Sequence, residues 1–166
     1  MVIEIDSLNV VYRDPAILYD AGDQYTETTG GWTNEGWTYY NNRIKPSYIY
    51  ATHMQVTGGY STTTGSGVSY ESIVGTVNPV SVNGYSKIYA NINITNEGSV
   101  YLGISPTKNA AESLGIVSNM AYRNGEHTLE INTSTLSGDY YIVIFAVGST
   151  NYGRNPSAQI TKVWTE

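Results

Sequence analysis

The 166-residue sequence has no cysteine and few charged residues, and each absence excludes a class of protein. Without cysteine, the chain cannot form disulfides or thiolate metal sites, so packing and hydrogen bonds must hold the fold together. Lysine and arginine total only eight, stand singly along the chain and leave a formal net charge of −6. We therefore expect no nucleic-acid partner, because no basic stripe is present to neutralise phosphates.

Long apolar runs are also missing. No stretch approaches the roughly 18 apolar residues that a membrane-spanning helix needs, so we predict no membrane insertion. The first residues, MVIEIDSLNVVYRDP, alternate polar and apolar side chains, which is not the pattern of a secretion signal. If the protein acts outside a cell, we expect a route other than a conventional signal peptide.

Catalytic patterns are equally scarce. The two histidines, His53 and His127, are far apart in the sequence, and neither stands in a zinc spacing such as H-E-x-x-H. No serine is framed as G-x-S-x-G, the pattern of a nucleophile turn. The sequence therefore predicts a protein that is not an enzyme.

Four of the fourteen acidic residues lie within one short segment: Asp20, Asp23, Glu27 and Glu35. Two of these carboxylates could serve glycoside hydrolysis if they lay roughly 5 to 10 Å apart. Oxygens of Asp20, Asp23 and Glu27 could instead hold calcium, which takes six to eight oxygen ligands. The sequence DAGD is nevertheless typical of a turn, so we predict a turn and no cofactor, with calcium as the alternative.

What the chain does have is glycine (17), tyrosine (16) and many Thr, Ser and Asn residues, a mixture that favours strands and tight turns. Short β-type runs alternate with turn signals along the chain. We predict an all-β fold, an antiparallel β-sandwich, in a single domain over residues 16–166. Residues 1–15 are predicted to be an N-terminal arm or connector strand, and at most one short helix is expected, at residues 107–115.

The stretch YSKIYANINIT, residues 85–95, places isoleucine or alanine at every second position, which predicts a strand with one face in the core. Its other face, with Tyr89, Asn91 and Asn93, is predicted to be wet or to form a binding surface. A turn at residues 96–98 precedes SVYLGIS, where we expect Val100, Leu102 and Ile104 to face inward. We therefore predict that the two strands form an antiparallel hairpin.

Three further runs define expectations for the sheets. YYIVIFAVG is apolar on both faces, which predicts a central strand covered on both sides. AQITKVWTE alternates, which predicts a strand with Ile160, Lys162 and Trp164 on one face. TGGYSTTTGSGVSY is too polar for a core and predicts a loop or an exposed hairpin.

The aromatic surplus suggests a binding surface. Tyrosine and tryptophan rings can stack on the apolar faces of sugars, while Asn, Asp, Gln and Ser can bind their hydroxyls, although protein-binding surfaces use similar residues. We predict that Trp32, Trp164, Phe145 and Tyr140 lie in the core. The candidate glycan platform consists of the aromatics at loop-like positions: Trp37, Tyr39, Tyr40, Tyr60, Tyr70, Tyr122 and Tyr152.

Several ordered stretches resemble one known family. LYDAGDQYTETTGGW, VSVNGYSKIYANINIT, VYLGIS, LSGDYYIVIFAVGS and ITKVWTE are similar to jelly-roll domains of tail-associated and minor structural proteins from bacteriophages and prophages of Gram-positive bacteria. That family is similar in architecture to carbohydrate-binding modules. The resemblance implies a jelly roll and a non-enzymatic domain at a virion tail, outside the host, with no binding-residue motif that could be transferred.

Three functions follow as hypotheses. The first is a phage tail-associated recognition domain that binds host cell-surface carbohydrate and contacts other tail subunits. The second is a structural or homo-oligomerising tail domain without a glycan ligand. The third is a carbohydrate-binding module of a polysaccharide-degrading enzyme.

Overall fold

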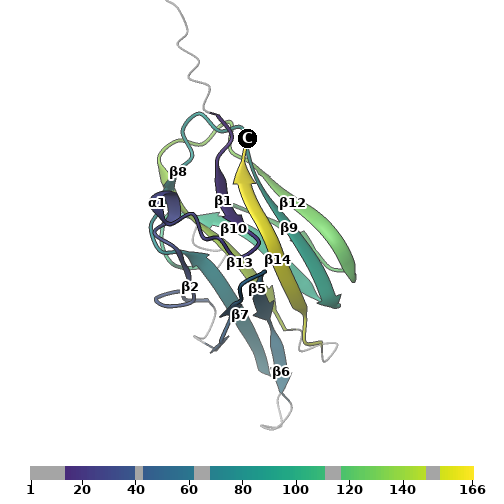
Figure 1. Ribbon diagram of the computed structural model, residues 1–166. Coiled ribbons are helices and arrows are strands. Elements are labelled where there is room, and N and C mark those ends of the chain that lie inside the picture. The colour runs from purple at the N-terminus through teal and green to yellow at the C-terminus, as the bar shows by residue number, and fades with distance from the viewer. Residues whose placement is uncertain (1–13, 40–42, 62–67, 111–116, 149–153) are drawn as a thin grey trace, which may run out of the picture.

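The computed structural model describes residues 14–39, 43–61, 68–110, 117–148 and 154–166 (Figure 1). Most of the predicted arm, residues 1–13, lies outside this part of the chain. These described residues form one short helix and fourteen strands. They are β1 (Ile17–Asp20), α1 (Thr26–Thr29), β2 (Trp32–Thr33), β3 (Ile44–Lys45), β4 (Tyr48–Ile49), β5 (Met54–Thr57), β6 (Gly59–Ser61), β7 (Val68–Thr76), β8 (Val80–Ser81), β9 (Lys87–Asn96), β10 (Ser99–Ser105), β11 (Val117–Ala121), β12 (Gly125–Asn132), β13 (Asp139–Val147) and β14 (Ser157–Thr165).

The strands form two sheets that pack face to face. Sheet A has the order β12-β9-β14-β5-β4, with β1 also paired to β14. Sheet B has the order β11-β10-β13-β7-β2, with β3 and β6 also paired to β7 and β8 to β13. The pairings among the described strands are antiparallel except for the short parallel contact of β3 with β7. The predicted antiparallel β-sandwich is confirmed.

The path of the chain is that of a jelly roll. The strands β5, β9, β12 and β14 lie in sheet A, and β7, β10, β11 and β13 lie in sheet B. Between these eight strands the chain crosses from one sheet to the other at every connection except that from β10 to β11. Two antiparallel sheets wound in this way match the predicted jelly-roll architecture.

The main core lies between the sheets. The predicted inward face of β9 is confirmed, because its burial alternates from Ile88 to Ile94. The inward face of β10, Val100 to Ile104, is confirmed too. The predicted hairpin of β9 with β10 is wrong, since β9 pairs with β12 and β14 whereas β10 pairs with β11 and β13. A hairpin and a corner between two facing sheets require the same alternation, so the pattern could not separate them.

A second, smaller core covers the outer face of sheet B. Central strand β13 is buried on both faces, as predicted, with Ile142 and Ile144 in the main core and Val143 and Phe145 in the smaller one. Trp37, Ile73 and Ala110 complete the smaller core. The segment around Trp37 therefore acts as a cover for apolar side chains that would otherwise face water.

The predicted helix at residues 107–115 is absent over residues 107–110, and residues 111–116 lie outside the described chain. The backbone there pairs with Thr38 instead: the Thr38 N–H donates to Lys108 O (3.0 Å), and the Ala110 N–H donates to Thr38 O (2.9 Å). A helix this short is marginal without support, so the tertiary bonds prevail. No helix in the described part of the chain is long and apolar enough to cross a membrane.

Strand β14 departs from the predicted alternation. Its register against β9 shifts between Ile160 and Lys162, so Thr161 is an extra residue, a β-bulge. Ile160 and Val163 therefore both face the core, and the predicted common face of Ile160, Lys162 and Trp164 is wrong.

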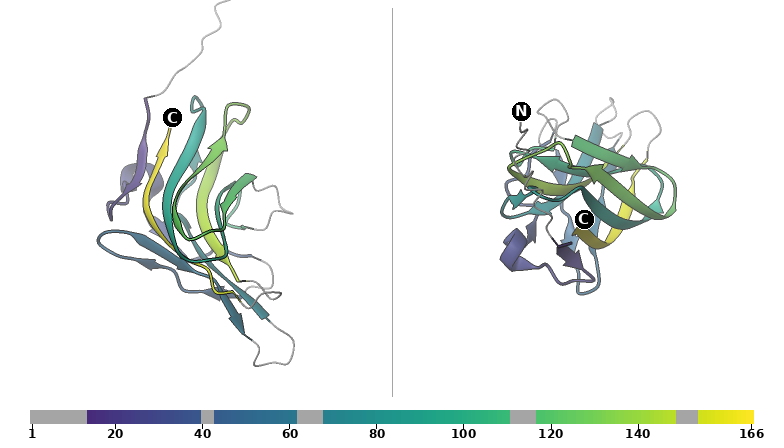
Figure 2. Two further views of the ribbon diagram at one scale, coloured as in Figure 1. Left: turned by 90° about the vertical axis from the view of Figure 1, so that its right-hand side faces the viewer. Right: turned by 90° about the horizontal axis from the view of Figure 1, so that it is seen from above.

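The polar stretch at residues 57–70 includes β6 and the first residues of β7, which pair as a hairpin, with residues 62–67 outside the described chain. The paired ends of β6 and β7 project beyond the rest of the sandwich (Figure 2), in keeping with the predicted exposed hairpin.

Candidate functional site

The outer face of sheet A carries an unbroken line of polar side chains across five strands. On β9, β14 and β5 these residues alternate with buried ones, and those on β12 and β4 are their partners in register, so all five point away from the core. The line, here named the polar row, spans about 19 Å because neighbouring strands lie about 4.8 Å apart. Its members, each in register with the next, are Glu126 (β12), Asn93 (β9), Gln159 (β14), Gln55 (β5) and Tyr48 (β4).

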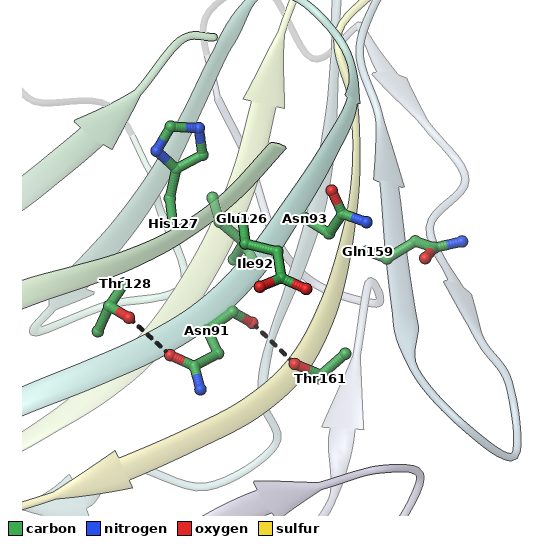
Figure 3. A pocket seen from close by; sticks show the side chains of 8 residues that line it. All are labelled: Asn91, Ile92, Asn93, Glu126, His127, Thr128, Gln159 and Thr161. Atoms are coloured by element: carbon green, nitrogen blue, oxygen red, sulfur yellow. Dashed lines mark hydrogen bonds between the residues drawn. The ribbon is translucent and has the colours of Figure 1, made fainter. Parts of the chain in front are cut away.

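A hollow of about 470 Å³ opens at the β12 end of the polar row (Figure 3). Its walls come from three adjacent strands, which hold their backbones in a fixed register. The bulge in β14 adds Thr161 to this surface. The lining residues are Asn91, Ile92, Asn93, Glu126, His127, Thr128, Gln159 and Thr161.

Hydrogen bonds fix part of this lining and leave part of it free. The Thr128 hydroxyl donates to Asn91 Oδ1 (2.9 Å), and the Thr161 hydroxyl donates to the Asn91 carbonyl oxygen (3.5 Å). Within the described chain, the side-chain amides of Asn93 and Gln159 have no hydrogen-bond partner. Each amide offers two N–H donors and one oxygen acceptor, so the hollow can both donate to and accept from a ligand.

Exposed aromatic rings stand at the opposite end of the polar row. Tyr48 and Tyr50 are 51% and 45% exposed, and their rings stack with centroids 6.0 Å apart. The Tyr50 ring also contacts His53, at 4.8 Å. Tyr48 shares a face with Gln55 because the two are partners in register, whereas the next pair is Ile49 with the buried Met54. Sequence reasoning missed this pair, which lies on and just after the short edge strand β4.

A second aromatic pair lies farther along β9 and β14. The rings of Tyr89 and Trp164 stack at 5.0 Å, with the Lys87 and Lys162 ammonium groups 5.8 and 5.6 Å from their respective centroids. The Tyr89 hydroxyl donates to the Glu166 carboxylate (2.8 Å), which raises the pKa of Tyr89. The prediction that Trp164 is a core residue is wrong, because the bulge turns it to the outer face. The predicted wet face of β9 is confirmed.

Trp37, the first member of the predicted platform, is only 3% exposed. Its ring fills the space that Gly75 leaves empty, since a Cβ at Gly75 would lie 2.2 Å from Trp37 Cζ2. Tyr39 is half-buried against Phe145, with ring centroids 5.6 Å apart. The prediction that Trp37 is an exposed stacking surface is therefore wrong, because Trp37 packs on the apolar outer face of β13.

The other predicted platform residues that belong to the described chain do not line the hollow. Tyr60 and Tyr70 lie on the β6–β7 hairpin, where the Lys45 ammonium is 5.5 Å from the Tyr70 ring centroid. The Tyr122 ring is contacted by the Arg154 guanidinium at 5.3 Å. Tyr40 and Tyr152 lie outside the described residues.

The acidic segment forms the predicted turn. The backbones of Asp20 and Asp23 bond reciprocally at 3.0 and 2.9 Å, and Asp23 Oδ1 accepts from the Tyr25 N–H (3.2 Å). Asp20 also lies 3.8 Å from Lys162 Nζ, and Glu27 is exposed on α1. The described residues contain no cluster of three or more metal-ligating His, Asp or Glu side chains. Calcium binding here stays a prediction.

One acid is buried away from the hollow. Glu71 on β7 is 4% exposed, and burial raises its pKa from 4.5 to about 7. Its neighbours in register are Val147 on β13 and Ile44 on β3. A single buried carboxyl does not form the pair of acids that glycoside hydrolysis requires.

Comparison with known proteins gives a structural likeness alone. No protein-family model matches the chain. No curated protein matches it either. Two mutants of a family 29 carbohydrate-binding module, studied for ligand recognition, are each 11% identical over 93% of this chain and 92% of theirs, with a TM-score of 0.49.

A third solved structure, another mutant of a family 29 carbohydrate-binding module, is 12% identical over 92% of this chain and 90% of its own, with a TM-score of 0.45. Superpositions at these scores do not establish a shared ligand. The ligand of this chain has to be inferred from its own surface.

Proposed function

We propose that this protein is a non-catalytic carbohydrate-binding module whose ligand lies along the polar row on the outer face of sheet A. The observation that carries the proposal is the pair of unpartnered amides of Asn93 and Gln159, held in the hollow and in register with the exposed Tyr48.

A glycan suits this surface for chemical reasons. Sugar hydroxyls both donate and accept hydrogen bonds, and side-chain amides can do the same. The exposed rings of Tyr48 and Tyr50 offer apolar area with few rotatable bonds, which lowers the entropy lost on binding. The row is also several times wider than one sugar ring, so an oligosaccharide suits it better than a single sugar. Strands hold all of these groups in place before the ligand arrives.

Isothermal titration with neutral oligosaccharides derived from glucan, mannan and xylan tests the proposal. We expect Gln159→Ala and Asn93→Ala each to weaken binding about tenfold, as the loss of about 1.4 kcal/mol would. Tyr48→Ala should weaken it similarly. Tyr122→Ala and Tyr70→Ala, which change aromatics outside the polar row, serve as controls. If these controls lose binding while Gln159→Ala binds fully, the glycan does not bind at the polar row.

The biological setting is a further part of the proposal. The resemblance of the sequence to tail-associated phage domains supports a place at a virion tail, with host cell-surface carbohydrate as ligand and other tail subunits as partners. Immunogold electron microscopy of purified virions tests this, with label at the tail tip as the expected result. Label absent from virions, with a polysaccharide hydrolase encoded beside the gene, would favour the module of a degrading enzyme instead.

A further inference from the structure

The hollow contains one carboxylate, that of Glu126, among otherwise uncharged polar groups. Within the described chain, this carboxylate has no ion-pair or hydrogen-bond partner. Figure 3 shows it directed toward the middle of the lining side chains, between those of Asn91 and Asn93. The other titratable lining residue, His127, is engaged with the Arg123 carbonyl oxygen, which accepts from the ring Nε2–H (2.6 Å).

The cationic groups around the hollow each lie close to an acidic side chain, and two of them share one acid. The Lys162 ammonium lies 3.8 Å from Asp20 Oδ2 and 5.6 Å from the Trp164 ring centroid. Beyond the end of β9, Arg123 and Arg154 both form ion pairs with Glu97. The described lining of the hollow includes no lysine or arginine, so a negatively charged ligand would meet Glu126 without a compensating cation.

We infer that Glu126 makes this site selective for glycans without negative charge. The inference rests on the proposed function and adds a ligand class to it. A carboxylate only accepts hydrogen bonds, and bonds from hydroxyls to a charged acceptor are stronger than those between neutral groups. Glu126 thus binds sugar hydroxyls, whereas it repels the carboxylates of uronic acids and the phosphates of teichoic acids at short range.

The test compares neutral and anionic ligands of similar length. Isothermal titration at low salt measures binding of xylan and mannan hexasaccharides, hexagalacturonate and purified teichoic acid to the full chain. We expect the wild type to favour the neutral ligands by at least about tenfold. Glu126→Gln should reduce this preference about fivefold, by weakening neutral binding and strengthening anionic binding. Wild type and Glu126→Gln should differ less in their affinity for hexagalacturonate in 1 M salt, which screens charges beyond about 3 Å.

Glu130→Gln is the matched control. It removes the same charge from the same face of β12, but Glu130 lies outside the hollow and pairs with Lys87 (3.3 Å). It should leave the preference unchanged. Glu126→Asp keeps the charge and should retain discrimination against hexagalacturonate. Circular dichroism and thermal unfolding verify that all three variants are folded.

The outcomes separate the inference from the proposed function. Tight binding of hexagalacturonate by the wild type, or equal effects of Glu126→Gln and Glu130→Gln, would overturn the inference and leave glycan binding intact. Failure to bind any of the ligands would overturn both.

Discussion

Trp37 and Gly75 fit together in the smaller core, where the absence of a side chain on one makes room for the ring of the other. The Trp37 indole N–H has no hydrogen-bond partner within the described chain, so its placement is favoured by apolar burial rather than by polar recognition. A tryptophan chosen for sugar stacking would need an exposed face, which this one lacks.

Substitutions at Trp37 and Tyr48 should therefore affect different quantities, namely stability for Trp37 and glycan affinity for Tyr48. We expect Trp37→Ala to lower the free energy of unfolding by about 3–5 kcal/mol, the usual cost of a large core truncation, and to leave glycan affinity unchanged under conditions where it is folded. Tyr48→Ala should leave the free energy of unfolding within about 0.5 kcal/mol of wild type but weaken glycan binding. Urea denaturation and isothermal titration measure the two quantities. If the Trp37→Ala protein is as stable as wild type but no longer binds glycan, Trp37 contacts the ligand and the assignment to the core alone is wrong.

Glu71 should make stability depend on pH. Its pKa is raised from 4.5 to about 7, so between these values the folded state holds a proton that the unfolded state has lost. The contribution of this group to stability is therefore greatest at low pH and is lost as the pH rises from about 4.5 to about 7.

Glu71→Gln removes this dependence. Relative to wild type, the variant should gain stability as the pH rises through this window, by about 3.5 kcal/mol at most, because one pKa unit corresponds to about 1.4 kcal/mol. Urea denaturation at pH 4, 6 and 8 measures the difference. A difference that stays constant with pH would show that Glu71 titrates normally.

At the scale of the element, the bulge in β14 decides which side chains reach the site. It inserts Thr161 into the ladder and keeps Val163 in the core while Trp164 turns outward. A regular strand with the same sequence would have turned Lys162 inward beside Ile160. The bulge therefore avoids the burial of an unpaired ammonium, which is far more costly than one locally disrupted ladder bond.

Deletions in β14 test this account. Removing Thr161 should restore a regular strand with Ile160 and Val163 still inward, so we expect a folded protein that loses about 1–2 kcal/mol through local hydrogen bonds. Removing Gln159 instead should force either Ala158 or Ile160 out of the core and prevent folding, because a one-residue shift exchanges the two faces. Circular dichroism and thermal melts compare the two deletions. If the two deletions destabilise the protein equally, Thr161 is not an extra residue that β14 can lose while keeping its inward face.

At the scale of the whole molecule, the two cores share strands. Strands β7 and β13 each contribute one face to the main core and the other face to the smaller core. A loss of packing on one side of these strands weakens their pairing on the other side as well. The cover around Trp37 is therefore part of the same cooperative unit as the sandwich.

Unfolding should accordingly occur in a single transition. We expect urea curves followed by tryptophan fluorescence and by far-ultraviolet circular dichroism to coincide, since coincident probes indicate two-state behaviour. Trp37→Ala should move both curves together to lower urea. An early fluorescence step in wild type, before any loss of circular dichroism, would show that the smaller core opens independently.

Much of the fold could be predicted from local pattern. The inward residues of β9 and β10 were predicted because a strand places alternate side chains on opposite faces. The two-sided burial of β13 followed from its unbroken apolar run. The candidate site was predicted only in part. The alternation identified the wet face of β9, but not the hollow beside it or the exposed Tyr48 at the far end of the polar row.

Sequence by itself determined that this chain forms strands, which faces of most of them are apolar, and that no reactive motif is present. Only the tertiary structure decided which strands pair, that β9 and β10 face each other across the core, that Trp37 is buried and Trp164 exposed, and that Asn93, Gln159 and Glu126 meet in one hollow. The reason is physical. Alternation depends on neighbours along the chain, whereas pairing, bulges and the covering of an apolar face depend on free-energy differences between contacts of residues far apart in the sequence.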